Sequence, residues 1–261
     1  MPQQREQRTA PTGKYRRLVE FLGAIVLDIG QDLRHPGKHR IRETWYYLDL
    51  CGRQSLGIVL LICGLMGFIL ALQGGLLIRQ YGGELFVADL VGYALLKELG
   101  PLMVAMIATG RAGSAFAAEI GTMRADEEIS AMCTMGISPT RFLVVPKLLA
   151  MFFALPLLTV FGNAAGLLGG LLIGVTYLEL PASAYCNRTM DVLTPTVLLL
   201  GVAKCFVFAI LITLVGCWRG FEAEENAQGV GRAATGAVVS SILLVVVADL
   251  FITLFYASIG Q

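Results

Sequence analysis

The chain has 261 residues, of which 56% are hydrophobic and 15% are charged, with a formal net charge of +1 and a mean hydropathy of +0.71. A soluble domain of this length carries about 25% charged residues. Residues 1–54 hold half of the 20 Lys and Arg, whereas long later stretches hold almost no charge. This pattern excludes an ordinary soluble domain and gives no sign of nucleic-acid binding. It predicts an all-α integral membrane protein with a basic cytoplasmic end.

The N-terminal segment, residues 1–54, predicts an amphipathic helix over residues 14–33. Its apolar side chains recur at helical spacing and its charged side chains lie opposite them; the apolar set is Leu18, Leu22, Ile25, Ile29 and Leu33. With its basic start, this helix is expected to lie in the membrane interface. Packing of the helix against a soluble partner is the alternative. Trp45, Tyr46 and Tyr47 then resemble an aromatic belt before the first span.

The membrane domain, residues 55–261, contains five segments long enough to cross hydrocarbon of about 30 Å, which takes about 20 residues. They are residues 55–78, 86–109, 146–175, 196–217 and 237–259. Sixteen of the 20 Lys and Arg fall on one side of these segments and two on the other. The positive-inside rule therefore predicts a cytoplasmic N-terminus and a periplasmic C-terminus. Within the third segment, Gly166, Gly170 and Gly174 are expected to let helices approach closely.

Four charged residues lie inside the predicted spans: Lys97 and Glu98 in the second, Lys204 in the fourth and Asp249 in the fifth. Each would cost at least roughly 2.5–3.5 kcal/mol if it faced lipid, so each is expected to face protein or a wet cavity. One interpretation is internal pairing, such as Lys204 with Asp249 or Glu98. The other is a transport site, which Gly100-Pro101 favours for Lys97 and Glu98 because proline loosens the helix beside them.

The cytoplasmic loop 110–145 predicts a short helix over residues 125–135. Acids suit its first turn, its apolar side chains share one side, and a glycine followed by a proline ends it. These residues are Asp126, Glu127 and Glu128, then Ile129, Met132 and Met135, then Gly136 and Pro139. A short helix held on a cytoplasmic loop between spans two and three is suited to docking a soluble subunit.

Motifs of catalysis are missing from the sequence. It contains no GxxxxGK[ST], GxSxG or HExxH, and its two histidines in HPGKH have no acidic or thiol neighbours. We therefore expect no enzyme activity, no metal site and no cofactor in this chain.

The run GYALLKELGPLMVAMIATGRAGSAFAAEIGTMRADEEISAMCTMGISP, residues 92–139, closely resembles the MlaE (YrbE) permease family of ABC transporters, which work with MCE proteins. LQGG (72–75), PLLTVFGNAAGLLGG (156–170) and GVGRAATGAVV (229–239) resemble the same family, and the likeness covers roughly residues 15–258. Two departures are modest: Lys97 stands where relatives often have Arg, which gives up bidentate phosphate geometry, and Cys133 adds a thiol.

The resemblance implies a homodimer of subunits with an interfacial helix and five spans in the bacterial inner membrane. Cytoplasmic ABC ATPases would bind and hydrolyse ATP with Mg²⁺, a hexameric MCE-domain protein would sit on the periplasmic side, and in some systems a STAS-domain protein joins. The implied function is movement of phospholipid between the inner membrane and the MCE protein, which maintains the lipid asymmetry of the outer membrane.

The resemblance also assigns residues to two sites. A lipid cavity at the dimer interface would involve Leu70, Leu77, Tyr81, Lys97 and Glu98. Residues 119–138, called the coupling segment below, would dock the ATPase through Glu119, Arg124, Asp126, Glu127, Glu128, Met132 and Met135. Two alternatives stay open: an ion-coupled secondary transporter with Glu98 and Asp249 as proton carriers, and a non-transporting scaffold that recruits a soluble partner.

Overall fold

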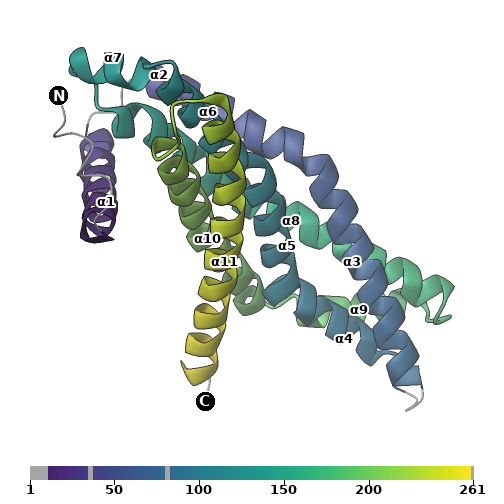
Figure 1. Ribbon diagram of the computed structural model, residues 1–261. Helices are drawn as coiled ribbons and strands as arrows, with labels where there is room; N and C mark the ends of the chain where they lie inside the picture. Colours follow the sequence, from purple (N-terminus) through teal and green to yellow (C-terminus); the bar gives the residue numbers. More distant parts are fainter. Residues whose placement is uncertain (1–10, 35–37, 80–82, 260–261) are drawn as a thin grey trace.

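The computed structural model describes residues 11–34, 38–79 and 83–259, and every regular element in these ranges is helical (Figure 1). The α-helices are α1 Pro11–Arg34, α2 Lys38–Leu48, α3 Gln54–Arg79, α4 Phe86–Tyr93, α5 Gly100–Ala108, α6 Ser114–Ala125, α7 Glu128–Thr134, α8 Val145–Thr176, α9 Ala182–Val192, α10 Pro195–Phe221 and α11 Ala227–Ile259. Short segments of wider π-helix join some of them: η2 Asp49–Arg53, η3 Ala94–Leu99, η4 Thr109–Gly113 and η5 Thr140–Val144.

Five helical runs in the described residues are long and apolar enough to cross a membrane, which confirms the predicted fold class. They are Arg42–Arg79, Phe86–Ala125, Thr140–Thr176, Pro195–Phe221 and Ala227–Ser258. The second run continues well past residue 109, where the sequence predicted a loop to begin. Gly110 and Gly113 do not break the chain there, because η4 carries it as π-helix directly into α6.

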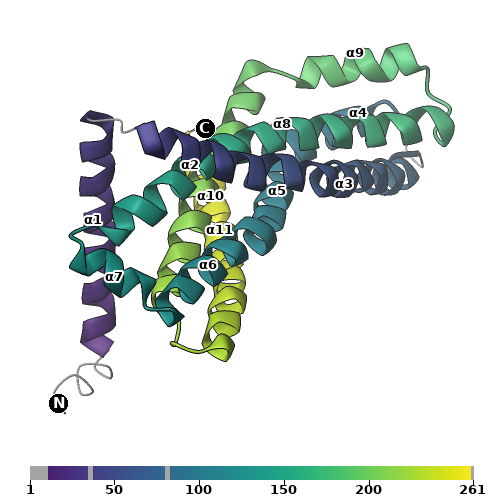
Figure 2. The ribbon, with the colours of Figure 1, turned by 90° about the horizontal axis from the view of Figure 1, so that it is seen from above.

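The helices form two packed groups that share α8. α3 packs along α8, whereas α10 packs against α11, α6 and α8. α2, α6 and α7 lie at one end of the molecule, and α4, α9 and the last turns of α11 lie at the other (Figure 1). α1 stands beside the bundle and is seen along its length in Figure 2.

In part of the contact between α3 and α8, glycines bring the two backbones together without intervening side chains. A Cβ atom on Gly67 would overlap the carbonyl oxygen of Gly166, and one on Gly169 would overlap that of Gly64. We call these four residues the glycine seam. Gly170 and Gly174 receive the ring of Tyr185 from α9 instead. The expectation that Gly166, Gly170 and Gly174 permit close approach is therefore confirmed.

Helix α1 packs on the protein through Ile25 of the predicted apolar side and through Phe21, which lies outside the predicted set. Phe21 and Ile25 are buried, and the Phe21 ring lies 5.2 Å from that of Trp218 and 5.8 Å from that of Phe221, centroid to centroid. Leu22, expected on the apolar side, is 37% exposed. The side chains of Leu18, Ile29 and Leu33 lie outside the described residues. Aromatic packing against α10 orients the helix, and its interfacial location stays a prediction.

Candidate functional site

The intramembrane charges of the second, fourth and fifth spans meet in one network. Lys204 of α10 is only 2% exposed, and its Nζ donates to Glu98 Oε2 of η3 and to Thr253 Oγ1 of α11, the latter at 2.9 Å. The same Nζ forms an ion pair with Asp249 Oδ1 at 2.8 Å. Thr253 donates in turn to Glu98 Oε2 at 3.2 Å. The internal pairing that the sequence left open is therefore present, with both carboxylates on one ammonium.

Local backbone structure brings these groups together. The π-helical turn η3 carries Lys97 and Glu98 and ends at Gly100-Pro101, whose proline occupies the first turn of α5, where a missing N–H costs little. On α10, a Cβ at Gly201 would overlap the carbonyl oxygen of Leu96. This close approach places the next turn of α10, with Lys204, against η3.

Lys97 takes a separate direction from Glu98. Its Nζ lies 5.5 Å from the ring centroid of Tyr256 on α11, within the range of a cation–π contact. Across residues 11–34, 38–79 and 83–259, no carboxylate forms an ion pair with Lys97. The side chain is half-buried. Lys97 thus carries a positive charge that the neighbouring network does not neutralise.

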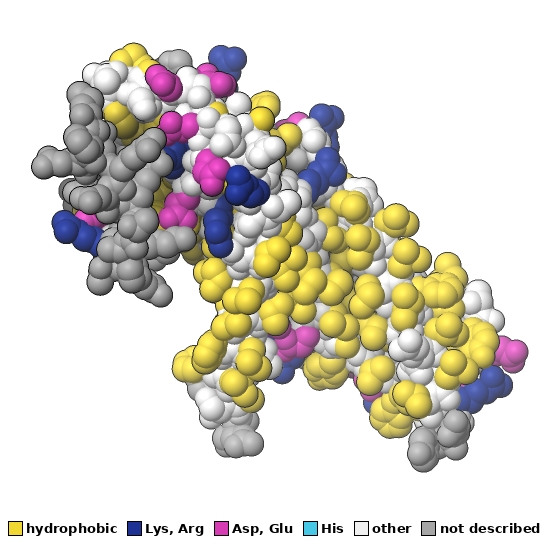
Figure 3. Space-filling model, in the orientation of Figure 1, with side chains coloured by type: hydrophobic (Ala, Val, Ile, Leu, Met, Phe, Trp, Pro, Cys, Tyr) yellow, Lys and Arg dark blue, Asp and Glu magenta, His cyan; other side chains and the backbone are white. Residues whose placement is uncertain are grey.

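An apolar recess separates two parts of the molecule on the face shown in Figure 3. The hollow lies between the C-terminal half of α11 and the ends of α3 and α4, and acidic and basic side chains reach the surface at its edge. The elements on either side carry exposed apolar side chains, among them Leu250 and Leu254 on α11 and Leu90 on α4. We call this hollow the recess.

The other predicted lipid-site residues are spread along α3. Leu70 is half-buried against the cluster of Ala71, Val87 and Val91, whereas Leu77 is 68% exposed. Tyr81 lies outside the described residues. The structure therefore brings Glu98, Lys204 and Asp249 together, places Lys97 beside them, and leaves Leu77 on the surface.

The short helix of the coupling segment begins three residues later than predicted. Asp126 ends α6, and Glu127 adopts a left-handed conformation with φ of 60°, so α7 starts at Glu128 and only this acid lies in its first turn. The predicted end is confirmed. Gly136 has φ of +74°, and its N–H and that of Ile137 bond the carbonyls of Cys133 and Met132 at 3.1 and 3.0 Å, a Schellman motif.

Helix α7 presents an open surface. None of its residues is buried, and the three acids are exposed. Ile129 and Met132 pack partly against the core, whereas Met135 is 66% exposed. The predicted apolar side is therefore divided between anchoring the helix and facing outward.

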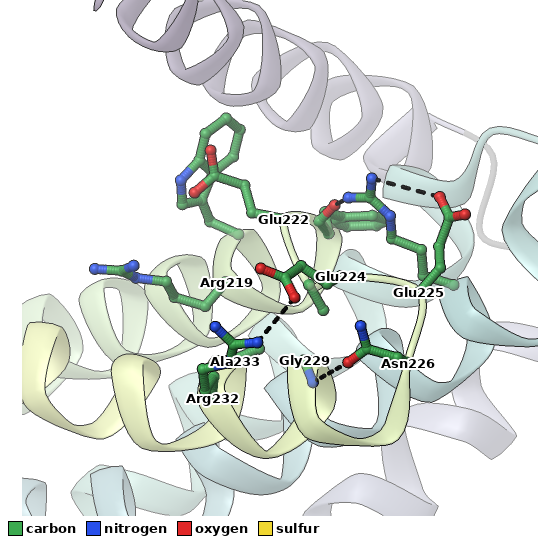
Figure 4. A pocket seen from close by; sticks show the side chains of 12 residues that line it. Arg219, Glu222, Glu224, Glu225, Asn226, Gly229, Arg232 and Ala233 are labelled. Carbon is green, nitrogen blue, oxygen red and sulfur yellow. Dashed lines mark hydrogen bonds and ion pairs between the residues drawn. The ribbon is translucent and has the colours of Figure 1, made fainter. Parts of the chain in front are cut away.

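Beside the coupling segment lies a pocket of about 960 Å³ (Figure 4). Its lining comes from the end of α6, the end of α10, the α10–α11 connection and the start of α11. Arg124 joins the two sides: its guanidinium donates to the carbonyl oxygen of Phe221 and lies 3.9 Å from Glu225. On the far wall, Arg232 pairs with Glu224 at 3.0 Å. Arg124 thus fixes the coupling segment to the α10–α11 connection. The sequence pointed to Arg124 as a docking residue but not to this attachment.

A second polar network, at the base of the coupling segment, was missed by sequence reasoning. Lys147 of α8 is completely buried, and its Nζ donates to Tyr47 of α2 at 2.9 Å and to Glu119 Oε1 of α6 at 3.0 Å. The Tyr47 hydroxyl donates to the same Glu119 oxygen at 2.6 Å. Glu119, predicted as a docking residue, therefore lies in an internal ion pair. The available signal was a lone lysine inside the apolar run FLVVPKLLAMFF.

The opposite end of the molecule is held by α9. Arg188 makes a two-point contact with Asp89 Oδ2 of α4, with N–O distances of 3.0 and 2.9 Å, and stacks over Phe86 at 5.4 Å. Tyr185 is inserted between α9 and α8, and burial raises its pKa to about 12. These contacts give α9 a fixed place on the third and second spans.

Comparison with known proteins adds independent evidence. The family description "Permease MlaE" matches residues 44–255. A probable ABC transporter permease protein of Rickettsia prowazekii is 35% identical over 214 residues, covering 79% of this chain and 83% of that protein. The intermembrane phospholipid transport system permease protein MlaE of Haemophilus influenzae is 31% identical over 249 residues, covering 90% and 95%.

A more distant relative is the chloroplast protein TRIGALACTOSYLDIACYLGLYCEROL 1 of Arabidopsis thaliana, 29% identical over 220 residues, covering 84% of this chain and 63% of that protein. The family match spans all five membrane helices and the coupling segment. Permeases of ABC transporters work with an ATPase partner that supplies the energy. This relationship argues against the alternative of an ion-coupled secondary transporter. The chain is thus a multi-pass membrane protein that belongs to the MlaE permease family, and it is the non-catalytic permease subunit of an ABC transporter.

Proposed function

We propose that this permease moves phospholipid between the bacterial inner membrane and a periplasmic MCE-domain protein, and so maintains the lipid asymmetry of the outer membrane. The Haemophilus relative, named for intermembrane phospholipid transport, supports phospholipid as the cargo. In this proposal two copies of the chain form the transport unit, cytoplasmic ATPases supply the energy from ATP and Mg²⁺, and a hexameric MCE protein receives or delivers the lipid. A STAS-domain protein would bind the ATPase.

The proposal places α2, α6 and α7 in the cytoplasm and α9 in the periplasm. The distribution of Lys and Arg supports this orientation. The structure separates the two sets of elements to opposite ends, with the exposed α7 and its adjoining pocket at the end assigned to the cytoplasm. An ATPase bound there would be far from an MCE protein bound near α9.

The observation that carries the proposal is the unequal neutralisation of two neighbouring lysines. Lys204 is bound by two carboxylates, whereas Lys97 contacts a tyrosine ring and has no carboxylate partner among the described residues. A phosphate head group needs a cation, and acyl chains need an apolar wall. Lys97 supplies the first, and the apolar helices beside the recess supply the second. Glu98 fixes the site through Lys204.

Lipid retention by variants tests this role. We expect Lys97→Ala to lower the phospholipid that co-purifies with the permease by about tenfold, equivalent to about 1.4 kcal/mol of binding, and to lower lipid transfer in proteoliposomes containing the ATPase. Lys97→Arg keeps the charge and should retain lipid. Arg53→Ala removes an exposed cation from an ion pair with Asp49 and serves as the control. Unchanged lipid content and transfer in Lys97→Ala would contradict the proposal.

A further inference from the structure

The network of Tyr47, Glu119 and Lys147 lies where the coupling segment leaves the membrane bundle and returns to it. Glu119 is the first residue of that segment, and Lys147 is the third residue of α8, which carries the chain back into the bundle. Their ion pair at 3.0 Å closes 28 residues of chain at its base. Tyr47 ties α2 to the same point. Three elements distant in sequence therefore meet at a single carboxylate oxygen.

The buried charge in this network is not needed for packing. A completely buried ammonium loses its hydration, and an apolar residue of similar size would fill the space with less desolvation. Every charged or hydroxyl group in the network nevertheless has a partner, and the rings of Tyr47 and Phe116 lie 4.4 and 5.8 Å from the Lys147 nitrogen. A fully partnered polar network of this kind holds one relative placement of its helices, because each shift would leave a buried group unpaired.

We infer that Tyr47, Glu119 and Lys147 form a clasp that makes the coupling segment, α2 and α8 move as one body when the ATPase displaces α7. α8 is packed on α3 through the glycine seam, so this body includes the first and third spans. The clasp thereby transmits the displacement to the α3 side of the recess, whereas Arg124 connects the same segment to the α10–α11 connection on the other side. The inference rests on the proposed function, because it takes α7 as the ATPase contact. The three residues are positioning residues and touch no substrate.

Coupling efficiency is the first test. The permease–ATPase complex in proteoliposomes is assayed for ATP hydrolysis and for labelled phospholipid transferred per ATP. Tyr47→Phe removes only the hydroxyl, Lys147→Met removes the charge, and Arg53→Met breaks an exposed ion pair as the matched control. We expect Lys147→Met to assemble with the ATPase and hydrolyse ATP but to transfer about tenfold less lipid per ATP, within the usual range of coupling effects. Lys147→Arg should restore part of the loss.

A lipid-independent test separates the clasp from the proposed function. Spin labels are placed on Cys133 of α7, which is exposed, and on a cysteine replacing Leu149 of α8, with the other exposed thiol, Cys186, changed to serine. With the native Tyr47, Glu119 and Lys147, we expect a narrow distribution of distances between the two labels, both with and without a non-hydrolysable ATP analogue. In Lys147→Met, this distribution should broaden.

Each result has a defined meaning. Unchanged lipid transfer per ATP and an unchanged distance distribution in Lys147→Met would overturn the clasp. Loss of transfer in strict proportion to loss of assembled complex, without rescue by Lys147→Arg, would also overturn it, because that pattern marks a purely structural residue. A wild-type complex that hydrolyses ATP without moving phospholipid would overturn the proposed function alone, and the distance measurement would still decide the clasp.

Discussion

Lys204 on α10 and Asp249 on α11 form an ion pair at 2.8 Å between the fourth and fifth spans, and the lysine is almost completely buried. Glu98 holds the same ammonium from the second span. Three membrane helices are therefore joined by one cation. Lys97, one residue before Glu98, stays outside this network and contacts the ring of Tyr256 instead.

Loss of Lys204 should destabilise the protein. Lys204→Met strands Glu98 and Asp249 without their cation, and removal of one partner of a buried pair costs about 3–5 kcal/mol. We expect a lower midpoint of thermal unfolding in detergent. The triple variant with Glu98→Gln and Asp249→Asn should recover much of the loss, because no charge remains unpaired. Equal midpoints for Lys204→Met and the native protein would show that the network contributes nothing to stability.

The glycine seam predicts a strong dependence on position within α3. Gly67→Ala would place a methyl group against the Gly166 carbonyl, and overpacking of this kind costs about 1–3 kcal/mol. Gly57→Ala on the same helix meets nothing within 4 Å and should be neutral or slightly stabilising, since alanine favours helix by up to about 1 kcal/mol. Unfolding midpoints of the two variants in the same detergent measure the difference. Equal midpoints would mean that α3 and α8 can separate without cost.

Two exposed methionines offer a matched test of the ATPase contact. Met135 at the end of α7 is 66% exposed and Met190 on α9, at the opposite end, is 69% exposed. Met135→Asp should reduce the amount of ATPase that co-purifies with the permease, because it places a charge in an apolar contact. Met190→Asp should leave it unchanged. An equal reduction in both variants would mean that the loss is not specific to a contact at α7. A reduction only in Met190→Asp would place the ATPase at the α9 end and reverse the proposed orientation.

The cap of α7 should influence ATPase binding through order in the helix. Gly136 has φ of +74°, and a residue with a Cβ in this conformation costs about 1–2 kcal/mol. Gly136→Ala should therefore increase hydrogen exchange of the α7 amides and weaken ATPase binding. Gly136→Asn should be milder, since asparagine tolerates this region. Gly231→Ala, in an open helical position of α11, is the control; if it matched Gly136→Ala, the cap would not be the cause.

Long-range information separates what could be predicted from what could not. The five spans, the all-helical class and the role of Gly166 follow from apolar length and spacing, which are local properties of the chain. The cap at Gly136 is local as well. The π-helical turn at Lys97 and Glu98 has no periodicity that distinguishes it from α-helix over so few residues. The sequence predicts too early a start for α7, because acidic residues favour the first turn of a helix whether or not the residue before it is left-handed.

Lys147 shows the limit most clearly. In the sequence, Lys147 is one more basic residue near a membrane boundary. Tyr47, 100 positions earlier, is one of three adjacent aromatics of the kind found at the membrane interface. The structure exposes Trp45 and Tyr46 but buries Tyr47 against the lysine. Which of three adjacent aromatics turns inward depends on the placement of α2 on α8, and no spacing rule supplies that. The same holds for Asp28, whose carboxylate accepts a hydrogen bond from Thr140 at 2.6 Å across 112 positions.

The backbone-to-backbone junction of α3 and α8 has a mechanical consequence. Side chains that interdigitate can exchange rotamers and slide, but two main chains in direct contact have no soft layer between them. The glycine seam therefore restricts sliding of α3 along α8 at the level of these four residues. We expect a change in the distance between the ends of α3 and α11 to come from tilting of α3 together with α8, or from displacement of α11, whose apolar surface is largely uncovered in the single chain.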